Sequence, residues 1–147
     1  MQERMNLAQI VPDAYRAVLG LEQYVQANVE HTILELVKLR ASMLNGCAFC
    51  VDMHSRDALA NGESSRRLFA VAAWREAPFF DERERAALAL TDAVTRLGEQ
   101  GVPDDVWEQA RKSWSEEEVA NLLMAIVTIN VWNRLAVTSH TQPPAQV

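Results

Sequence analysis

Residues 35–54, ELVKLRASMLNGCAFCVDMH, contain both cysteines of the chain together with a glutamate and a histidine. The run from Leu36 to Leu44 is mostly apolar and helical in character, and the Asn45-Gly46 dipeptide after it is typical of a tight turn. We therefore expect two antiparallel helices joined by a short connection. Cys47 and Cys50 then lie at the start of the second helix.

Helix geometry predicts that the four reactive side chains of this hairpin meet. At about 1.5 Å rise per residue, Glu35 and His54 lie roughly 16 and 13 Å from the turn, and so at nearly the same depth. Cys50 is four residues before His54, and Cys47 is one turn before Cys50, so each pair shares a helix face. This spacing predicts a relay: Glu35 orients His54, His54 takes the proton of Cys50, and Cys47 closes a disulfide. The positive end of the helix dipole also favours a thiolate.

The cysteines have two other interpretations. Free cysteine is often buried simply as a small apolar residue. Cys47, Cys50, His54 and Glu35 also offer four zinc ligands, but structural zinc sites usually draw on a second Cys or His pair, which this chain lacks. The cysteine spacing, the preceding turn and His54 together favour redox chemistry.

Composition disfavours several classes of partner. The chain has 147 residues, of which 49% are hydrophobic, and this length is enough for one core, so we expect a single domain over residues 1–147. A net charge of −6 disfavours nucleic acid and anionic membranes as partners. No stretch resembles a secretory signal or a membrane span, so we expect a cytoplasmic protein. In that reducing compartment a closely spaced cysteine pair is more often catalytic or metal-binding than a structural crosslink.

The rest of the chain is helical by its periodicity and capping signals. The fold class that we predict is all-α, with six or seven helices built on the central hairpin. Capping boxes at Asp81/Glu84 and Ser115/Glu118 begin the last long helices, and Pro12 suits a first helical position. The expected helices span 9–28, with a candidate kink at Gly20, then 32–44, 47–60, 64–75, 85–97, 103–112 and 116–139.

Several polar residues in these helices need an explanation. Glu35 and Lys38 are the charged residues of an otherwise apolar helix. Glu35 lies at the same depth as His54, and this match favours its burial. Asn130 and Asn133 interrupt the apolar run 126–137, where we expect structural hydrogen bonds or a subunit contact. His31 lies one turn before Glu35, so one interpretation places it near the same pocket, but we favour an exposed residue near a helix start. We interpret the arginines at 66, 67, 83 and 85 as a solvated face.

The spacing of Glu35, Cys47, Cys50 and His54 resembles that of the AhpD-like alkylhydroperoxidases of the carboxymuconolactone decarboxylase superfamily. The run NGCAFCVDMH, residues 45–54, is typical of small single-domain members. The resemblance implies an AhpD-like helical fold, assembly into homotrimers or homohexamers, and a thiol peroxidase. Cys50 matches the peroxide-attacking cysteine and Cys47 the resolving one. In the best-defined members a histidine precedes the second cysteine, and here that position is Phe49.

The expected function is therefore that of a thiol-dependent peroxidase, which reduces hydroperoxides through a Cys50 sulfenic acid and a Cys47–Cys50 disulfide. A dithiol reductant, or a lipoyl-type or thioredoxin-like partner, restores the pair, and no metal or organic cofactor is needed. One alternative is a lactone decarboxylase, although that branch of the superfamily generally lacks the cysteine pair. The other is a non-enzymatic redox-sensing or interaction module whose disulfide changes an interface.

Overall fold

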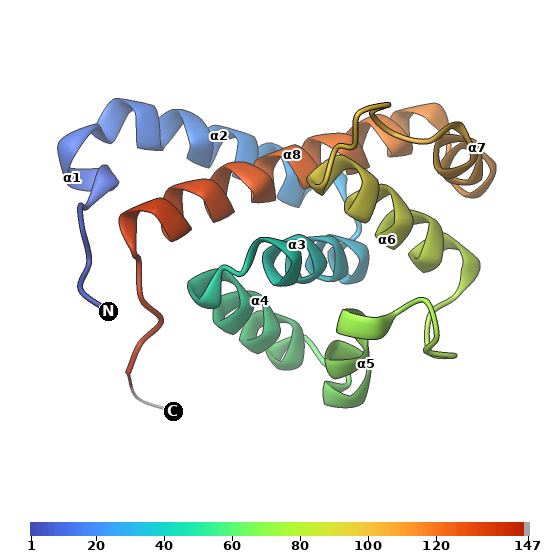
Figure 1. The fold of residues 1–147 in the computed structure, drawn as a ribbon, viewed down its shortest axis with the longest axis horizontal. Coiled ribbons are helices and arrows are strands. Elements are labelled where there is room, and N and C mark those ends of the chain that lie inside the picture. Colours follow the sequence, from blue (N-terminus) through green and yellow to red (C-terminus); the bar gives the residue numbers. More distant parts are fainter. Residues whose placement is uncertain (146–147) are drawn as a thin grey trace.

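The computed structural model describes residues 1–145, and over this range the chain forms α-helices and one short 3₁₀-helix (Figure 1). Within these residues no β-strand forms, and the all-α prediction is confirmed. The elements are α1 (Leu7–Ile10), α2 (Pro12–Asn28), α3 (His31–Asn45), α4 (Ala48–Ala60), α5 (Ser65–Ala70), η1 (Val71–Ala73), α6 (Glu82–Thr95), α7 (Asp104–Ser113) and α8 (Glu116–Ser139).

Helix α3 is the centre of the molecule. Every residue from Ile33 to Leu39 is buried, as expected for a helix that is apolar around most of its circumference. It packs against α4, α6 and α8, while α2 and α8 run alongside each other across one side of it (Figure 1). The hairpin that carries the cysteines is therefore held between other helices on several sides.

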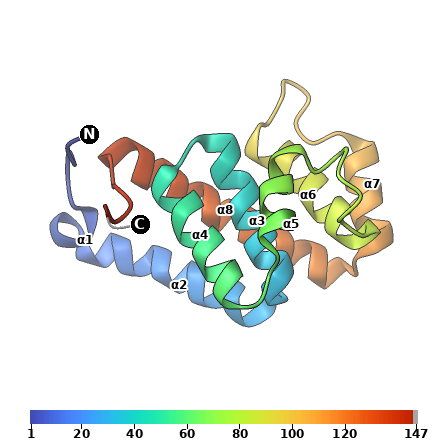
Figure 2. The ribbon, with the colours of Figure 1, turned by 90° about the horizontal axis from the view of Figure 1, so that it is seen from below.

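The segment before α1 and the segment that follows α8 up to residue 145 lie at the same end of the molecule (Figure 2). The backbone N–H of Arg4 donates to the carbonyl of Ser139 at 2.8 Å, and its guanidinium donates to the carbonyl of Thr138 at 3.2 Å. The segment before α1 is thereby tied to the end of α8.

Most of the predicted helix starts agree with the structure within one residue, whereas the helices expected to begin at 9 and 85 begin at Pro12 and Glu82. Asp81 with Glu84, and Ser115 with Glu118, form reciprocal capping boxes at α6 and α8. Pro12 begins α2, and because it cannot continue a preceding helix, the short α1 forms a separate eighth α-helix beyond the six or seven predicted. Helix α2 continues through Gly20 without interruption.

The helix predicted over 64–75 is shorter in the structure. Helix α5 ends at Ala70, and the chain tightens into the 3₁₀ turn η1. Arg40 from α3 donates to the carbonyls of Val71 and Ala72, at 3.3 and 3.0 Å. The carbonyls of this turn thus find a donor on α3, which ties the turn to the central helix.

The interpretation of four arginines as a solvated face is wrong for two of them. Arg67 is half-buried and pairs with Glu84 at 2.5 Å and with Glu63 at 3.0 Å. Arg85 donates to three carbonyls of the loop before α6. Arg67 therefore links α5 to α6, and Arg85 ties the preceding loop to α6, whereas Arg66 and Arg83 are exposed as predicted.

Helix α8 is long and apolar enough to cross a membrane by length and composition alone. The sequence prediction that no such stretch exists therefore needs correction on this criterion. The core helix of a soluble protein meets the same test, and α8 packs along α2, α3 and α6. Its apolar character is accounted for in part by the helices that it contacts.

Candidate redox site

The turn between α3 and α4 places the cysteines. Gly46 adopts φ 65°, a left-handed conformation that glycine reaches without strain, and it reverses the chain after Asn45. Cys47 is the N-cap of α4 in an extended conformation, and its sulfur accepts the backbone N–H of Cys50 at 3.3 Å. The predicted turn is thus the feature that puts the pair at a helix start.

Hydrogen bonds from α8 hold this turn. The amide of Asn45 donates to the side-chain oxygens of Asn130 and Asn133, each at 2.9 Å. Asn133 in turn donates to the hydroxyl of Ser42 at 3.0 Å. The polar residues that interrupt α8 therefore make structural hydrogen bonds, as predicted.

Cys47 and Cys50 are joined by a disulfide, with their Cα atoms 5.3 Å apart. Each residue is only 2% exposed. A Cα separation of this size is ordinary for a disulfide, so the one-turn spacing needs no backbone rearrangement to close the bond. The structure represents the oxidised form of the pair that the spacing predicts.

Glu35 and His54 meet across the hairpin, as their matched depth predicts. His54 Nδ1 lies 3.2 Å from Glu35 Oε2, and both residues are buried. A carboxylate at this position favours the tautomer with the proton on Nδ1. Nε2 is then the nitrogen that can take a proton from a thiol.

A cavity of about 460 Å³ lies along one face of the hairpin. Cys50, His54 and Glu35 line it, whereas Cys47 does not. Phe49, at the position of the family histidine, contributes to the wall. The other large apolar or aromatic lining residues include Tyr15, Leu19, Met53, Trp132 and Leu135.

The termini complete the wall of this cavity. Residues 3, 5–8, 139 and 141 line it together with the helices. These segments are the ones that the Arg4 hydrogen bonds hold together. The cavity therefore depends on contacts between opposite ends of the chain.

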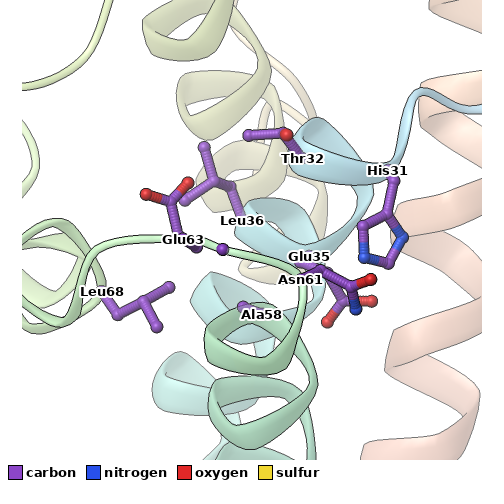
Figure 3. A pocket seen from close by; sticks show the side chains of 9 residues that line it. His31, Thr32, Glu35, Leu36, Ala58, Asn61, Glu63 and Leu68 are labelled. Atoms are coloured by element: carbon purple, nitrogen blue, oxygen red, sulfur yellow. The ribbon is translucent and has the colours of Figure 1, made fainter.

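A second, smaller pocket of about 110 Å³ lies between the start of α3 and the residues that end and follow α4 (Figure 3). His31, Asn61 and Glu63 are among its lining residues, and Glu35 lines both this pocket and the larger cavity. His31 is exposed, as the sequence predicts. Glu35 therefore lies between the small pocket and the larger cavity.

A buried ion pair, for which the sequence analysis predicted no role, also lines the large cavity. Lys38 on α3 is 1% exposed and pairs with Glu22 on α2. Glu22 also accepts hydrogen bonds from Gln26 at 2.9 Å and from the indole of Trp132 at 3.1 Å. Burial alone would raise the pKa of Glu22, but the ammonium and the neutral donors favour its charged form and hold the pKa below its usual value.

The signal for this ion pair was present in the sequence. Lys38 interrupts an otherwise apolar stretch of α3 one turn after Glu35. Its partner Glu22 lies in a different helix and has no local feature that distinguishes it from an exposed acid. Only the packing of α2 against α3 brings the two charges together.

The fold and site define a class: an AhpD-like, all-helical protein with a Cys-x-x-Cys pair beside a buried Glu–His pair. The chain belongs to the carboxymuconolactone decarboxylase family, whose sequence model matches residues 12–93. Among proteins of known sequence it is similar to the uncharacterized protein YdfG of Bacillus subtilis (strain 168). The two are 36% identical over 138 residues, which cover 93% of this chain and 94% of YdfG.

Two solved structures are close in fold. One is ATU0492 of Agrobacterium tumefaciens, a protein of unknown function suggested to be the antioxidant defence protein AhpD. It is 45% identical, with a TM-score of 0.95 over 99% of this chain and 100% of the other. The other is the debrominase Bmp8, 22% identical, with a TM-score of 0.81 over 91% of this chain and 73% of the other. At that identity the likeness concerns the fold alone.

Proposed function

We propose that this protein is a thiol-dependent peroxidase that reduces organic hydroperoxides. The observation that carries the proposal is that Cys50, and not Cys47, lines a cavity together with the His54–Glu35 pair. A thiol that can react with a small molecule needs access, a base and an orienting group for that base. Cys50 has all three, and Cys47 lies within disulfide distance of it.

The proposed reaction begins with reduced cysteines. His54 takes the proton of Cys50, and the thiolate attacks the outer oxygen of the hydroperoxide, so an S–O bond forms as the O–O bond breaks. The leaving alkoxide takes that proton and departs as an alcohol. The Cys50 sulfenic acid then condenses with the Cys47 thiol to give the disulfide and water. A dithiol reductant, or a lipoyl-type or thioredoxin-like partner, returns both cysteines to thiols as it is oxidised to its own disulfide.

The cavity supports an organic hydroperoxide over hydrogen peroxide as the substrate. Its volume of about 460 Å³ lies in the range of roughly 300 to 1,000 Å³ that is usual for small-molecule sites. Hydrogen peroxide needs little more space than a water molecule, whose share of liquid volume is about 30 Å³. The aromatic and aliphatic lining suits an apolar substituent, and Phe49 extends that lining where the family histidine would place a polar group.

Turnover separates this proposal from the alternatives. Reduced protein mixed with cumene hydroperoxide and excess dithiothreitol is expected to consume many equivalents of peroxide, whereas a redox sensor reacts once. Stopped-flow tryptophan fluorescence, followed with cumene hydroperoxide and with hydrogen peroxide, is expected to show faster oxidation by the organic substrate. A rate no greater than that of free cysteine with both peroxides would refute the peroxidase. A lactone decarboxylase would instead release carbon dioxide from a carboxylated lactone with both cysteines alkylated.

We also propose that the protein is a cytoplasmic homo-oligomer, a trimer or hexamer. Leu123, Val127 and Val137 are exposed apolar side chains on α8, and each is between 36 and 43% exposed. Such a row is commonly covered by a subunit contact. Light scattering at micromolar concentration is expected to give a multiple of the 16.5 kDa chain mass, and the mass of a single chain would contradict the assembly.

A further inference from the structure

Lys38 is a buried cation with an incomplete set of partners. Its ammonium carries three N–H donors, and among the described residues only Glu22 accepts from it. Burial of an ion pair costs several kcal/mol of desolvation per ion, and an apolar pair of the same volume is often no less stable. Stability alone therefore does not explain why the pair is charged and not apolar, and two of the three Lys38 donors have no acceptor among the described residues.

The register of the hairpin places Lys38 level with Cys50. The two helices are antiparallel, and Glu35 meets His54 across them. Lys38 is three residues nearer the turn than Glu35, and Cys50 is four residues nearer than His54. These offsets correspond to about 4.5 and 6 Å along the two helices, so the side chains start from nearly the same depth. Both residues line the same cavity.

The charges around the cavity explain why a cation is needed there. Four carboxylate residues line it, and their combined field opposes formation of a thiolate. Among the described residues that line the cavity, Lys38 is the one lysine or arginine, and His54 is the one histidine. The titratable residues of this lining are Glu3, Tyr15, Glu22, Glu35, Lys38, His54, Asp57 and, in the reduced protein, Cys50.

We propose that Lys38 is a further catalytic residue, whose ammonium stabilises the Cys50 thiolate and donates a hydrogen bond to the oxygen that leaves when the O–O bond breaks. This role rests on the proposed function, in which Cys50 is the attacking sulfur. Negative charge moves from sulfur to the leaving oxygen during the step, and a fixed donor between them stabilises both positions. The leaving oxygen then takes the proton that His54 removed from the thiol, so Lys38 ends the step still charged.

Glu22 is the positioning residue for this cation. It holds the ammonium by one donor, while Gln26 and Trp132 occupy other acceptor positions of the same carboxylate. A long lysine side chain has many rotamers, and this anchor limits them. The ion pair thus keeps the ammonium inside the cavity, where an unpaired lysine would turn toward solvent.

The first arm of the test measures Cys50 alone and needs no peroxide. In a Cys47→Ser background, the rate of alkylation by iodoacetamide is followed from pH 5 to 10, with and without Lys38→Met. We expect Lys38→Met to move the midpoint of the profile upward by about one pH unit, a loss of about tenfold in thiolate at neutral pH. Lys38→Arg keeps the cation and should restore most of the reactivity. Superimposable profiles for Lys38→Met and its parent would overturn the proposal.

A double variant controls for unfolding of Lys38→Met. Lys38→Met leaves Glu22 as a buried charge without its main partner, which can unfold the chain. Glu22→Gln/Lys38→Met removes both charges and keeps the volume, and circular dichroism checks its fold. The proposal expects the upward shift in this variant as well. An unshifted midpoint in a folded double variant would overturn it.

The second arm separates the leaving-oxygen role from the proposed function. The rate of Cys50 oxidation by tert-butyl hydroperoxide is measured at a pH where Cys50 is fully ionised in all variants. Lys38→Met should lower this rate about tenfold, because it removes one hydrogen bond to a charged group, which is worth about 1.5 kcal/mol. Lys38→Met should lower the rate of oxidation by peracetic acid less, because the leaving group is then acetate, a weak base that needs little stabilisation. Equal losses with both oxidants would overturn this role. If the parent reacts with no hydroperoxide but Lys38→Met still shifts the alkylation profile, the peroxidase is refuted and the effect of Lys38 on the thiolate stands.

Discussion

Replacing Cys50 by serine is expected to abolish reaction of the reduced protein with cumene hydroperoxide, by at least about a thousandfold, as is usual when an enzyme loses its nucleophile. Cys47→Ser should still react once, at a rate near that of wild type, and then stop as a sulfenic acid. The reason is access: Cys50 lines the cavity and Cys47 does not. Mass spectrometry after dimedone treatment is expected to show one adduct on Cys50 in Cys47→Ser and none in Cys50→Ser.

The two cysteines compete on physical grounds that favour different answers. Cys47 is the N-cap of α4 and so lies nearest the helix dipole, which is worth typically 0.3 to 1 kcal/mol. Cys50 has His54 one turn away, and in papain such a pairing lowers the pKa of a cysteine from about 8.5 to about 3 to 4. The histidine should outweigh the dipole. A reactive thiol that survives in Cys50→Ser would reverse this assignment and make Cys47 the nucleophile.

Glu35→Gln is expected to slow oxidation by cumene hydroperoxide about a hundredfold at neutral pH, at the lower end of what a general-base system contributes. Glutamine keeps the size of the side chain and can still accept the hydrogen bond from His54, now 3.2 Å away, but it removes the charge that stabilises the imidazolium. The imidazolium in turn stabilises the Cys50 thiolate. The effect should therefore shrink as the pH rises above the value at which the thiol ionises unaided.

The measurement is the rate of oxidation against pH for wild type and Glu35→Gln. Glu76→Gln is a matched control, because it makes the same chemical change at an exposed residue outside the cavity. This control should follow the wild-type profile at every pH. A Glu35→Gln profile that coincides with that of wild type would show that the buried carboxylate has no part in the relay.

Much of the fold follows from local sequence. The capping boxes at Asp81 and Ser115, the turn at Gly46 and the helical periodicity each act within a few residues, so their predictions are confirmed closely. The meeting of Glu35 with His54 was also predictable, because one short turn links their helices and fixes their relative depth. Geometry over twenty residues is enough for that prediction.

The parts that were wrong or missing depend on contacts between distant helices. Helix α5 is shorter than predicted, and Arg40 of α3 donates to two carbonyls of the 3₁₀ turn after it, 31 and 32 residues away. Arg67 crosslinks to Glu84 across 17 residues and is not a solvated side chain. A helical pattern gives the face on which a charge lies but does not identify the residue that neutralises it.

The sequence alone determined the helical class and the constellation of Glu35, Cys47, Cys50 and His54, since each of these depends on helical periodicity and one turn. Only the tertiary structure decided that Cys50 lines a cavity and that Lys38 is buried beside Glu22. The carboxylate of Glu22 also accepts from Trp132, 110 residues away along the chain. The physical reason is that a cavity and a buried charge pair are properties of packed helices, whose mutual placement no local spacing specifies.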